Sequence, residues 1–402
     1  MASANASVTT GSNDPEGLLP ERLLPEMLLD AARALVPLVI ATRDEANRQA
    51  DVLPEMIAAI QAAGLLRAFQ PARWGGLELD PRHVFDLQNV FAEHCLSTAW
   101  VFGVLSVQSF MLGRMDPLAQ SDVWGDDPDA LVSSSFAPVG QVTPVEGGYR
   151  IGGRFTFSSG CSHARWAVVG GMVPSDEARA APQMRLFLVP MGDCRIDRVW
   201  ETFGLRATGS NDLVIVDAFV PAYRTYVPDS GLLPLPAASG LSPLYRLPWL
   251  HVFGSSISNL AVGAGRGALT KFIAVTRDRQ GAAGSGASRD NPRYLSVIGR
   301  ARVEIDAVER QLRDNYARLA DHVACDLALP LDEALLYRAE LTGTLRRITV
   351  LVDEMMLLLG GRGIQRDGPL TQLWLDLSAA RAHAGNDPAA IHAQIAGELL
   401  NA

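Results

Sequence analysis

The sequence has few of the residue patterns that mark a metal site, a disulfide scaffold or a nucleotide-binding turn. Its 402 residues include four cysteines, Cys95, Cys161, Cys194 and Cys325, and none of them forms a CxxC pair. This spacing argues against a disulfide scaffold and a zinc site, and the seven histidines form no HExxH or other ligand spacing. No GxGxxG turn follows a predicted strand, so we expect that the chain does not bind NAD(P)H itself.

Long apolar runs and an excess of basic residues are also missing. Apolar runs such as Met355–Leu359 fall far short of the roughly 20 residues that span a bilayer. The formal net charge is -9 and no basic stripe is present, which argues against a nucleic-acid partner. Residues 1–20 are rich in Ser, Ala, Asn and Gly and lack the features of a signal peptide, so they predict a disordered terminus and a cytoplasmic protein.

The full sequence is 48% hydrophobic, enough to bury a large core, and residues 21–402 fall into three stretches of different periodicity. Residues 21–125 repeat apolar side chains at helical spacing, which predicts an N-terminal helical domain. In residues 126–235, short runs rich in Val, Phe and Ile, such as Trp166–Val173, alternate with Gly, Pro and Asp and predict a central β domain. Helical spacing returns in residues 236–402, which predicts a C-terminal helical bundle.

Six motifs occur in the same order as in one family of enzymes. They are GLLRAFQPARWGGLE (Gly64–Glu78), STAW (Ser97–Trp100), DPDALVSSSFAP (Asp127–Pro138), FTFSSGCSHARW (Phe155–Trp166), FGLRATGSND (Phe203–Asp212) and RAHAGNDP (Arg381–Pro388). Through them the sequence resembles the oxygenase components of two-component flavin-dependent monooxygenases (group D), relatives of p-hydroxyphenylacetate hydroxylase and 3-hydroxy-secosteroid hydroxylase. The resemblance implies an α+β, acyl-CoA dehydrogenase-like fold with a central β-barrel domain between the two helical parts.

The resemblance also implies a cofactor and partners. Reduced flavin, either FMNH2 or FADH2, would react with O2 as co-substrate to form a C4a-hydroperoxyflavin that hydroxylates a small aromatic or polycyclic substrate. A separate NAD(P)H:flavin reductase would supply the reduced flavin, and the chain would form a homotetramer. The surplus of apolar residues in Ile348–Gly361 independently predicts a subunit interface.

Serines near two strand ends are the candidates for the reactive edge of the flavin. A hydroperoxyflavin survives only if N5 keeps its proton in a dry pocket, which requires a hydrogen-bonding group there. By the resemblance, Ser159 lies near N5 and Ser134 lies elsewhere at the reactive edge, both as catalytic residues, with Ser135 and Ser158 as further cofactor contacts. Taken alone, these serines favour turn chemistry.

Two further groups complete the predicted flavin site. The segment RATGSND combines a glycine turn with the hydroxyls of Thr208 and Ser210 and the cation of Arg206, which suits a polar flavin edge or a phosphate. Without the resemblance this segment predicts only a β-turn. Trp100 and Phe253 match aromatic positions that line the isoalloxazine and the substrate, although single aromatics at helical spacing also fit a core.

His383 is the candidate for proton transfer. It matches the family's C-terminal active-site histidine, and an imidazole that titrates near neutral pH can remove or deliver a proton. Asn386, in the same HAxND motif, is a candidate substrate contact, although it and Asp387 also fit helix capping. In the phenol hydroxylases a histidine faces the substrate where this chain has Gln108, and glutamine is not a base at neutral pH. Gln108 is therefore a candidate substrate contact that leaves the identity of the substrate open.

Three alternative functions remain open on the sequence alone. An acyl-CoA dehydrogenase of the same fold would use Asp367, in GGRGIQRDGP, as its base. An N-oxygenase of an amine would keep the flavin and O2, and Gln108 in place of histidine leaves room for it. A catalytically silent helical scaffold would leave the hydroxyl-rich strand ends and His383 unexplained.

Overall fold

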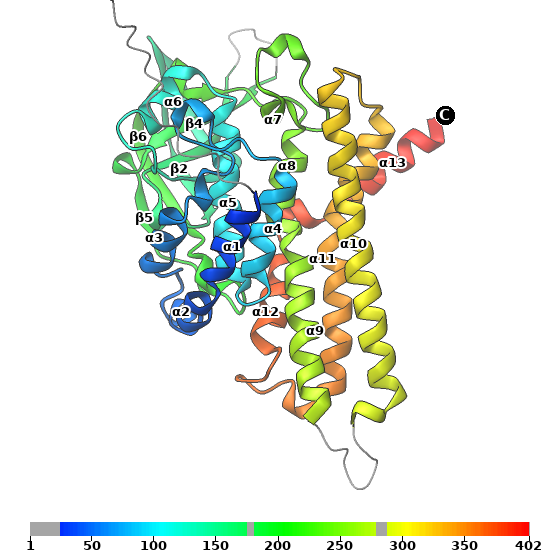
Figure 1. Ribbon diagram of the computed structural model, residues 1–402. Helices are drawn as coiled ribbons and strands as arrows, with labels where there is room; N and C mark the ends of the chain where they lie inside the picture. Colours follow the sequence, from blue (N-terminus) through cyan, green and yellow to red (C-terminus); the bar gives the residue numbers. More distant parts are fainter. Residues whose placement is uncertain (1–24, 175–180, 279–287, 402) are drawn as a thin grey trace, which may run out of the picture.

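The computed structural model describes residues 25–174, 181–278 and 288–401, and it begins with helices (Figure 1). Asp80 and Asp116 cap two of them: each carboxylate accepts a hydrogen bond from the backbone N–H two residues on, and a proline takes the first helical position. The predicted disordered terminus, residues 1–20, lies outside the described residues. The helices of this part are α1 (Pro25–Ala34), α2 (Val36–Gln49), α3 (Pro54–Ala62), α4 (Pro81–Ala92), α5 (Leu96–Gly113) and α6 (Pro117–Trp124).

Helix α5 lies between the other helices and the sheet. Within the described residues it alone is long and apolar enough to cross a membrane, and 89% of its 18-residue window is buried inside the protein. It contacts α4, α8 (Trp249–Ser258) and strand β1 (Val132–Val145). A helix that is apolar all round and covered by its own protein is a core helix. Its residues include both Trp100 and Gln108.

The strands form one seven-stranded sheet in the order β5-β6-β2-β1-β3-β4-β7. Strands β1 and β2 pair antiparallel, whereas β1 and β3 pair in parallel. Successive side chains alternate between the two faces: Val168 and Leu188 pack against the helices, and Val169 and Phe187 belong to a separate core on the other face. The remaining strands are β2 (Gly148–Ser158), β3 (Trp166–Val173), β4 (Gln183–Pro190), β5 (Arg195–Asp197), β6 (Asn211–Pro221) and β7 (Thr225–Tyr226).

The central domain is predicted as a β-barrel, but the barrel is not closed, because the sheet of the described residues is open. It curls around its own small core, which draws residues from β1, β2, β3, β4 and β6. In the described part of the chain, however, the two edge strands β5 and β7 do not pair with each other. These strands have three and two residues, so they offer too few backbone groups to close a ring of strands.

Long helices form the C-terminal part, and Figure 1 shows α9, α10 and α11 side by side, away from the sheet. Within Ile348–Gly361, most apolar side chains are buried inside the chain itself, and only Val350 and Leu357 are exposed. Helix α13 projects from the body in Figure 1, and none of its residues is buried. Besides α8, these helices are α7 (Pro243–Arg246), α9 (Leu260–Asp278), α10 (Pro292–Ala324), α11 (Leu331–Leu359), α12 (Thr371–Ala380) and α13 (Ala389–Asn401).

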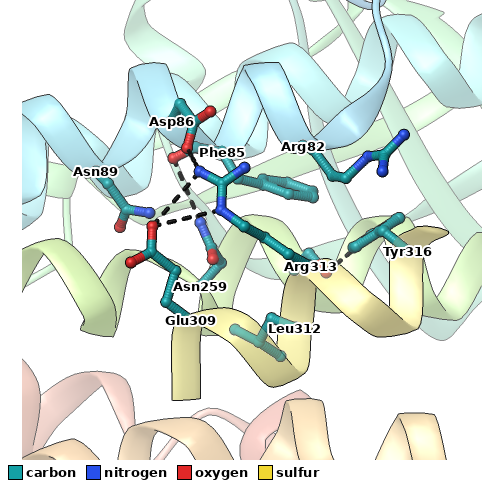
Figure 2. Close-up of a pocket in the computed structure, with 10 residues that line it drawn as sticks. Arg82, Phe85, Asp86, Asn89, Asn259, Glu309, Leu312, Arg313 and Tyr316 are labelled. Carbon is teal, nitrogen blue, oxygen red and sulfur yellow. Dashed lines mark hydrogen bonds and ion pairs between the residues drawn. The ribbon is translucent and has the colours of Figure 1, made fainter. Parts of the chain in front are cut away.

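A small polar region holds α4 against the bundle. Arg313 on α10 forms an ion pair with Asp86 on α4 and lies 3.4 Å from Glu309, one turn away (Figure 2). Asn259, directly after α8, donates a hydrogen bond of 3.4 Å to the carbonyl of Phe85. We call these residues the α4–α10 junction. The hollow between them measures about 20 Å³, enough for one water, so it is a packed structural contact.

Candidate active site

A cavity of about 720 Å³ lies where α5, the sheet and the C-terminal helices meet. Its walls are mostly apolar, with hydroxyl groups and one imidazole among them. A volume of this size accommodates a multi-ring organic molecule. The predicted site residues that line it are Trp100, Ser134, Ser135, Ser159, Ser210, Phe253 and His383.

Alternation at the end of β2 determines which serine reaches the cavity. Phe157 and Ser159 line it, whereas Ser158 between them is completely buried, and its Oγ has no hydrogen-bond partner among the described residues. Phe157 has a φ of 63° and lies in a register shift between Phe155 and Ser158. This left-handed conformation is strained for a residue with a bulky side chain, and such strain concentrates at functional sites.

A chain of hydrogen bonds runs from Trp100 to the backbone of Leu205. Nε1 of Trp100 donates to Oγ of Ser159 over 3.1 Å, and Ser159 Oγ lies 2.7 Å from Ser210 Oγ. Ser210 Oγ is in turn 2.7 Å from Oγ1 of Thr208, which donates to the carbonyl of Leu205 over 2.8 Å. Thr208 is completely buried and does not line the cavity, so it acts only through its neighbours.

Contacts with Asp51 and Asp376 hold the turn that carries Thr208 and Ser210. Leu205 and Gly209 each have a φ of 52°, and a Cβ on Gly209 would lie 2.6 Å from a carboxylate oxygen of Asp51. The backbone N–H of Leu205 donates to Oδ1 of Asp376 over 2.7 Å. Burial raises the pKa of Asp376 to about 6, because the interior disfavours its charged form.

Gln108 acts on the cavity through Ser134. Gln108 is buried and does not line the cavity, but its Nε2 donates to Ser134 Oγ over 2.9 Å. A serine that accepts this bond keeps its own proton, and no acceptor for that proton occurs among the described residues, so Ser134 offers a donor to the cavity. The hydroxyl of the neighbouring Ser135 donates a hydrogen bond of 2.8 Å to the carbonyl of Thr156, so its proton is not available to the cavity.

His383 lies against Trp100, with the ring centroids 5.6 Å apart. Its Nδ1 accepts the backbone N–H of Gly385 over 3.0 Å, so the neutral ring carries its proton on Nε2. Burial, together with the nearby Arg338 cation, lowers the pKa of His383 to about 4. This environment differs from the titration near neutral pH that the sequence predicts. At pH 7 the ring is a neutral N–H donor.

Arg338 on α11 is a buried cation that the sequence analysis did not identify. It is 7% exposed and donates to the carbonyls of Leu250, over 2.8 Å, and Gly385, over 3.2 Å. Gly254 leaves room for it, since a Cβ there would lie 1.9 Å from the guanidinium. Burial lowers the pKa of Arg338 to about 10, so it remains charged at pH 7, and among the described residues it has no carboxylate partner. Its charge favours an anion nearby.

Aromatic rings form another part of the wall. The ring of Phe253 lies 5.3 Å from that of Phe136 and 5.1 Å from that of Trp249, measured between centroids. Trp200 and Phe157, which also line the cavity, pack edge to face at 6.1 Å. Phe136, Phe157 and Trp200 are not among the site residues predicted from the sequence. Each lies within or beside a matched motif, and this adjacency was the available signal.

Several predicted residues lie outside the cavity. Arg206 does not line it and donates to two backbone carbonyls instead. Asn386 is completely buried and donates to the carbonyls of Ile257 and Ala380, so it holds the turn after His383. Asp367 is exposed and does not line the cavity, so it is not placed to serve as the base of a dehydrogenase there.

Helices pack against one face of an open sheet, and the cavity between them, with its hydroxyls, aromatic rings and histidine, defines a site for an organic ligand. Residues 255–388 match the family model of the acyl-CoA dehydrogenase C-terminal domain. The chain is 34% identical over 358 residues to the flavin-dependent monooxygenase oxygenase subunit HsaA of Rhodococcus jostii, which covers 88% of this chain and 93% of the relative. This chain belongs to the family of oxygenase subunits of flavin-dependent monooxygenases.

Two further comparisons agree with this family. The oxygenase component of an FADH2-dependent resorcinol hydroxylase from Rhizobium is 30% identical, over 86% of this chain and 87% of its own length. The structure of XiaF from Streptomyces in complex with FADH2 and glycerol superposes with a TM-score of 0.86 at 26% identity, over 94% of this chain and 96% of XiaF. The predicted membership and the acyl-CoA dehydrogenase-like character of the fold are therefore confirmed.

Proposed function

We propose that this chain uses reduced flavin, FMNH2 or FADH2, and O2 to hydroxylate a planar aromatic or polycyclic substrate in the 720 Å³ cavity. The observation that carries the proposal is that Trp100, Ser134, Ser159 and His383, from four separate segments, line one apolar space. The FADH2 bound to XiaF and the FADH2 dependence of the resorcinol hydroxylase support the choice of cofactor.

The groups around the cavity fit a reduced flavin and a phenolic substrate. Ser159 and Ser210 have lone pairs to accept hydrogen bonds, and Ser134 and His383 have protons to donate. The positive charge of Arg338 favours the anionic form of a flavin or a phenol. A flavin and a substrate that fill this mostly apolar space would displace water from it. When bound, the reduced flavin supplies the electrons with which one oxygen atom enters the substrate and the other leaves as water.

The catalytic residues in this proposal are Ser159, Ser134 and His383. Ser159 holds the N5 proton by accepting a hydrogen bond, while Ser134 and His383 donate to the oxygen atoms of the substrate or of the activated O2. We also propose domains of residues 21–125, 126–235 and 236–402, each of which contributes lining residues to the cavity.

The proposed partners are a separate NAD(P)H:flavin reductase and three further copies of this chain, in the cytoplasm. The support for a homotetramer is apolar surface without cover in the single chain: Leu357 on α11 is 73% exposed, and Leu400 on α13 is 87% exposed. Sedimentation equilibrium at micromolar concentration tests this, and a stable monomer would contradict it.

An anaerobic mixing experiment tests the proposed activity. The chain is titrated with reduced FMN or FAD and then mixed with oxygenated buffer that contains resorcinol, p-hydroxyphenylacetate or indole-3-acetate, the compounds in the names of three relatives. We expect a hydroxylated product from at least one phenol and little free hydrogen peroxide. If reduced flavin did not bind, or if every turnover released peroxide with no product from any aromatic, the proposal would be wrong. Incubation of the chain alone with NADH and flavin should consume no NADH.

A further inference from the structure

The hydrogen-bond chain behind Ser159 has only one allowed direction. Each hydroxyl has a single proton, an indole N–H can only donate, and a backbone carbonyl can only accept. The hydroxyl of Thr208 donates a hydrogen bond to the carbonyl of Leu205. Ser210 must therefore be the donor in the 2.7 Å hydrogen bond between Ser210 and Thr208. The 2.7 Å bond between Ser210 and Ser159 must then be donated by Ser159.

This direction leaves Ser159 as an acceptor toward the cavity. Its proton goes to Ser210, one lone pair takes the N–H of Trp100, and one lone pair remains. Ser210 also lines the cavity. Because its hydroxyl donates to Thr208, it too can only accept a hydrogen bond from a ligand. The wall formed by these two serines can therefore accept a hydrogen bond from a ligand but cannot donate one.

The far end of the chain is held in place. The carbonyl of Leu205 also accepts from Nε1 of Trp200 over 2.9 Å, and the N–H of Leu205 is held by Asp376. Reversing the direction would require the hydroxyl of Thr208 to leave this carbonyl while it is completely buried. Without that movement, reversal would point the Thr208 proton at Ser210 and leave Oγ1 of Thr208 and the carbonyl oxygen of Leu205 2.8 Å apart with no proton between them, which is a repulsive contact.

We propose that Thr208 and Ser210 are positioning residues that make the cavity select reduced over oxidised flavin, by directing the proton of Ser159 away from the ligand. This inference rests on the proposed function, in which the N5 edge of the flavin meets Ser159. Reduced flavin carries a proton on N5 and donates there, whereas oxidised flavin has only a lone pair at N5. Serines that can only accept a hydrogen bond pair with the N5–H of reduced flavin. They leave the N5 lone pair of oxidised flavin facing another lone pair.

Two substitutions at Thr208 separate its hydroxyl from its shape. Thr208→Val keeps the branched side chain and removes the hydroxyl, whereas Thr208→Ser keeps the hydroxyl and is the matched control. Dissociation constants are measured for oxidised FMN and for dithionite-reduced FMN under anaerobic conditions. The readout is the dissociation constant of oxidised FMN divided by that of reduced FMN. We expect the ratio to fall about tenfold in Thr208→Val, the effect of one hydrogen bond, and to stay within about twofold of the original in Thr208→Ser.

The midpoint potential of bound FMN provides an independent readout, because tighter binding of the reduced form raises it. A tenfold loss of selectivity lowers the potential by about 30 mV for a two-electron couple. Ser210→Ala removes the acceptor of the Ser159 proton directly and should lower the ratio at least as much, which covers the case in which Thr208→Val fails to fold. Equal ratios in the original chain, Thr208→Val and Ser210→Ala would overturn the inference. If the original chain did not bind reduced FMN or FAD at all, the proposed function itself would be wrong.

Discussion

The α4–α10 junction and the large cavity use polar groups in opposite ways. In the junction, the cation of Arg313 contacts the carboxylates of Asp86 and Glu309, and the space between them holds about 20 Å³. In the cavity, the free proton of Ser134 and the Nε2–H of His383 have no partner in the described chain, and about 720 Å³ remains open. Polar groups that stabilise a fold form hydrogen bonds and ion pairs with one another, whereas polar groups that bind a ligand have donors or acceptors without a protein partner.

The two arginines of these regions show the same contrast. Arg313 is 43% exposed and has two carboxylate partners, so its charge is balanced where it lies. Arg338 is buried and donates only to backbone carbonyls, so its charge acts on the groups around it, including His383. A buried, unbalanced cation is costly for stability, and its position next to the His383 turn is consistent with a functional role.

The largest expected effect is the loss of hydroxylation rate when His383, in the large cavity, is replaced. We expect His383→Ala to lower the rate of hydroxylation by about 100-fold, the usual loss for a positioned proton donor. Because burial holds the pKa of His383 near 4, the ring stays neutral above pH 5, and its titration should not appear in the rate between pH 6 and 8. The measurement is kcat against pH for whichever phenol the mixing experiment shows to be hydroxylated, with a reductase supplying the flavin.

His383→Gln is the control for this prediction, since glutamine can both accept the N–H of Gly385 and donate an N–H. It should retain more activity than His383→Ala. An acidic limb with a midpoint near pH 6.5 in the original chain that vanishes in His383→Gln would contradict the neutral-donor role.

The next effect concerns Asp376, a buried carboxylate that supports the cavity. Its pKa rises from 3.8 to about 6 on folding, so the folded chain holds a proton that the unfolded chain has lost between these pH values. Stability from this group is therefore present below pH 4 and is lost as the pH rises through 6. At 1.36 kcal/mol per pKa unit, the ionised group costs roughly 3 kcal/mol at pH 8.

Asp376→Asn removes this cost and keeps an oxygen for both hydrogen bonds, from Leu205 and Gln372, which end on the same Oδ1. We expect the variant to be more stable than the original chain at pH 8, by up to roughly 3 kcal/mol, and equally stable at pH 4. Urea unfolding at the two pH values measures this difference. A difference that did not change with pH would mean that Asp376 is ionised in both states.

Sequence patterns predicted the parts of this fold that repeat or that match motifs. Helical spacing and motif order were sufficient for the acyl-CoA dehydrogenase-like class, and the motifs located Ser134, Ser159 and His383. Barrel closure depends on β5 and β7, which are too short to leave a periodic signal in the sequence. Periodicity therefore could not show that the sheet is open.

The electrostatics of the site depend on packing, which one sequence does not reveal. The low pKa of His383 follows from its burial and from Arg338, 45 positions earlier in the chain. The correspondence of Gln108 to a histidine of the phenol hydroxylases likewise did not reveal that this residue lies behind Ser134, away from the cavity surface. Motif matching located residues, and only the fold assigned donors and acceptors to them.

A smaller effect is expected from the junction. Arg313→Ala leaves Asp86 and Glu309 without their shared cation, and we expect the free energy of unfolding to fall by about 1 kcal/mol, since the partly exposed pair is screened by water. The matched control is Arg302→Ala, which removes an exposed pair with Asp306 on the same helix and should cost less. Urea unfolding gives both values. Binding of reduced FMN should be unchanged in both variants, and a weakened flavin affinity in Arg313→Ala alone would link the two regions.

The smallest effect is expected from Gln108, because it reaches the cavity only through Ser134. Gln108→Leu keeps a similar volume and removes the N–H that holds the Ser134 hydroxyl, so the proton of Ser134 is no longer directed at the cavity. Since one neutral hydrogen bond is weakened and not lost, we expect the KM for the phenol that the mixing experiment identifies to rise about threefold. The inhibition constant of a hydroxyl-free aromatic of similar size should not change, because that molecule offers no oxygen to Ser134. Steady-state kinetics with both compounds decide the matter: equal weakening of the two would show that Gln108 only supports packing, whereas a loss confined to the phenol assigns Ser134 as the donor to its oxygen.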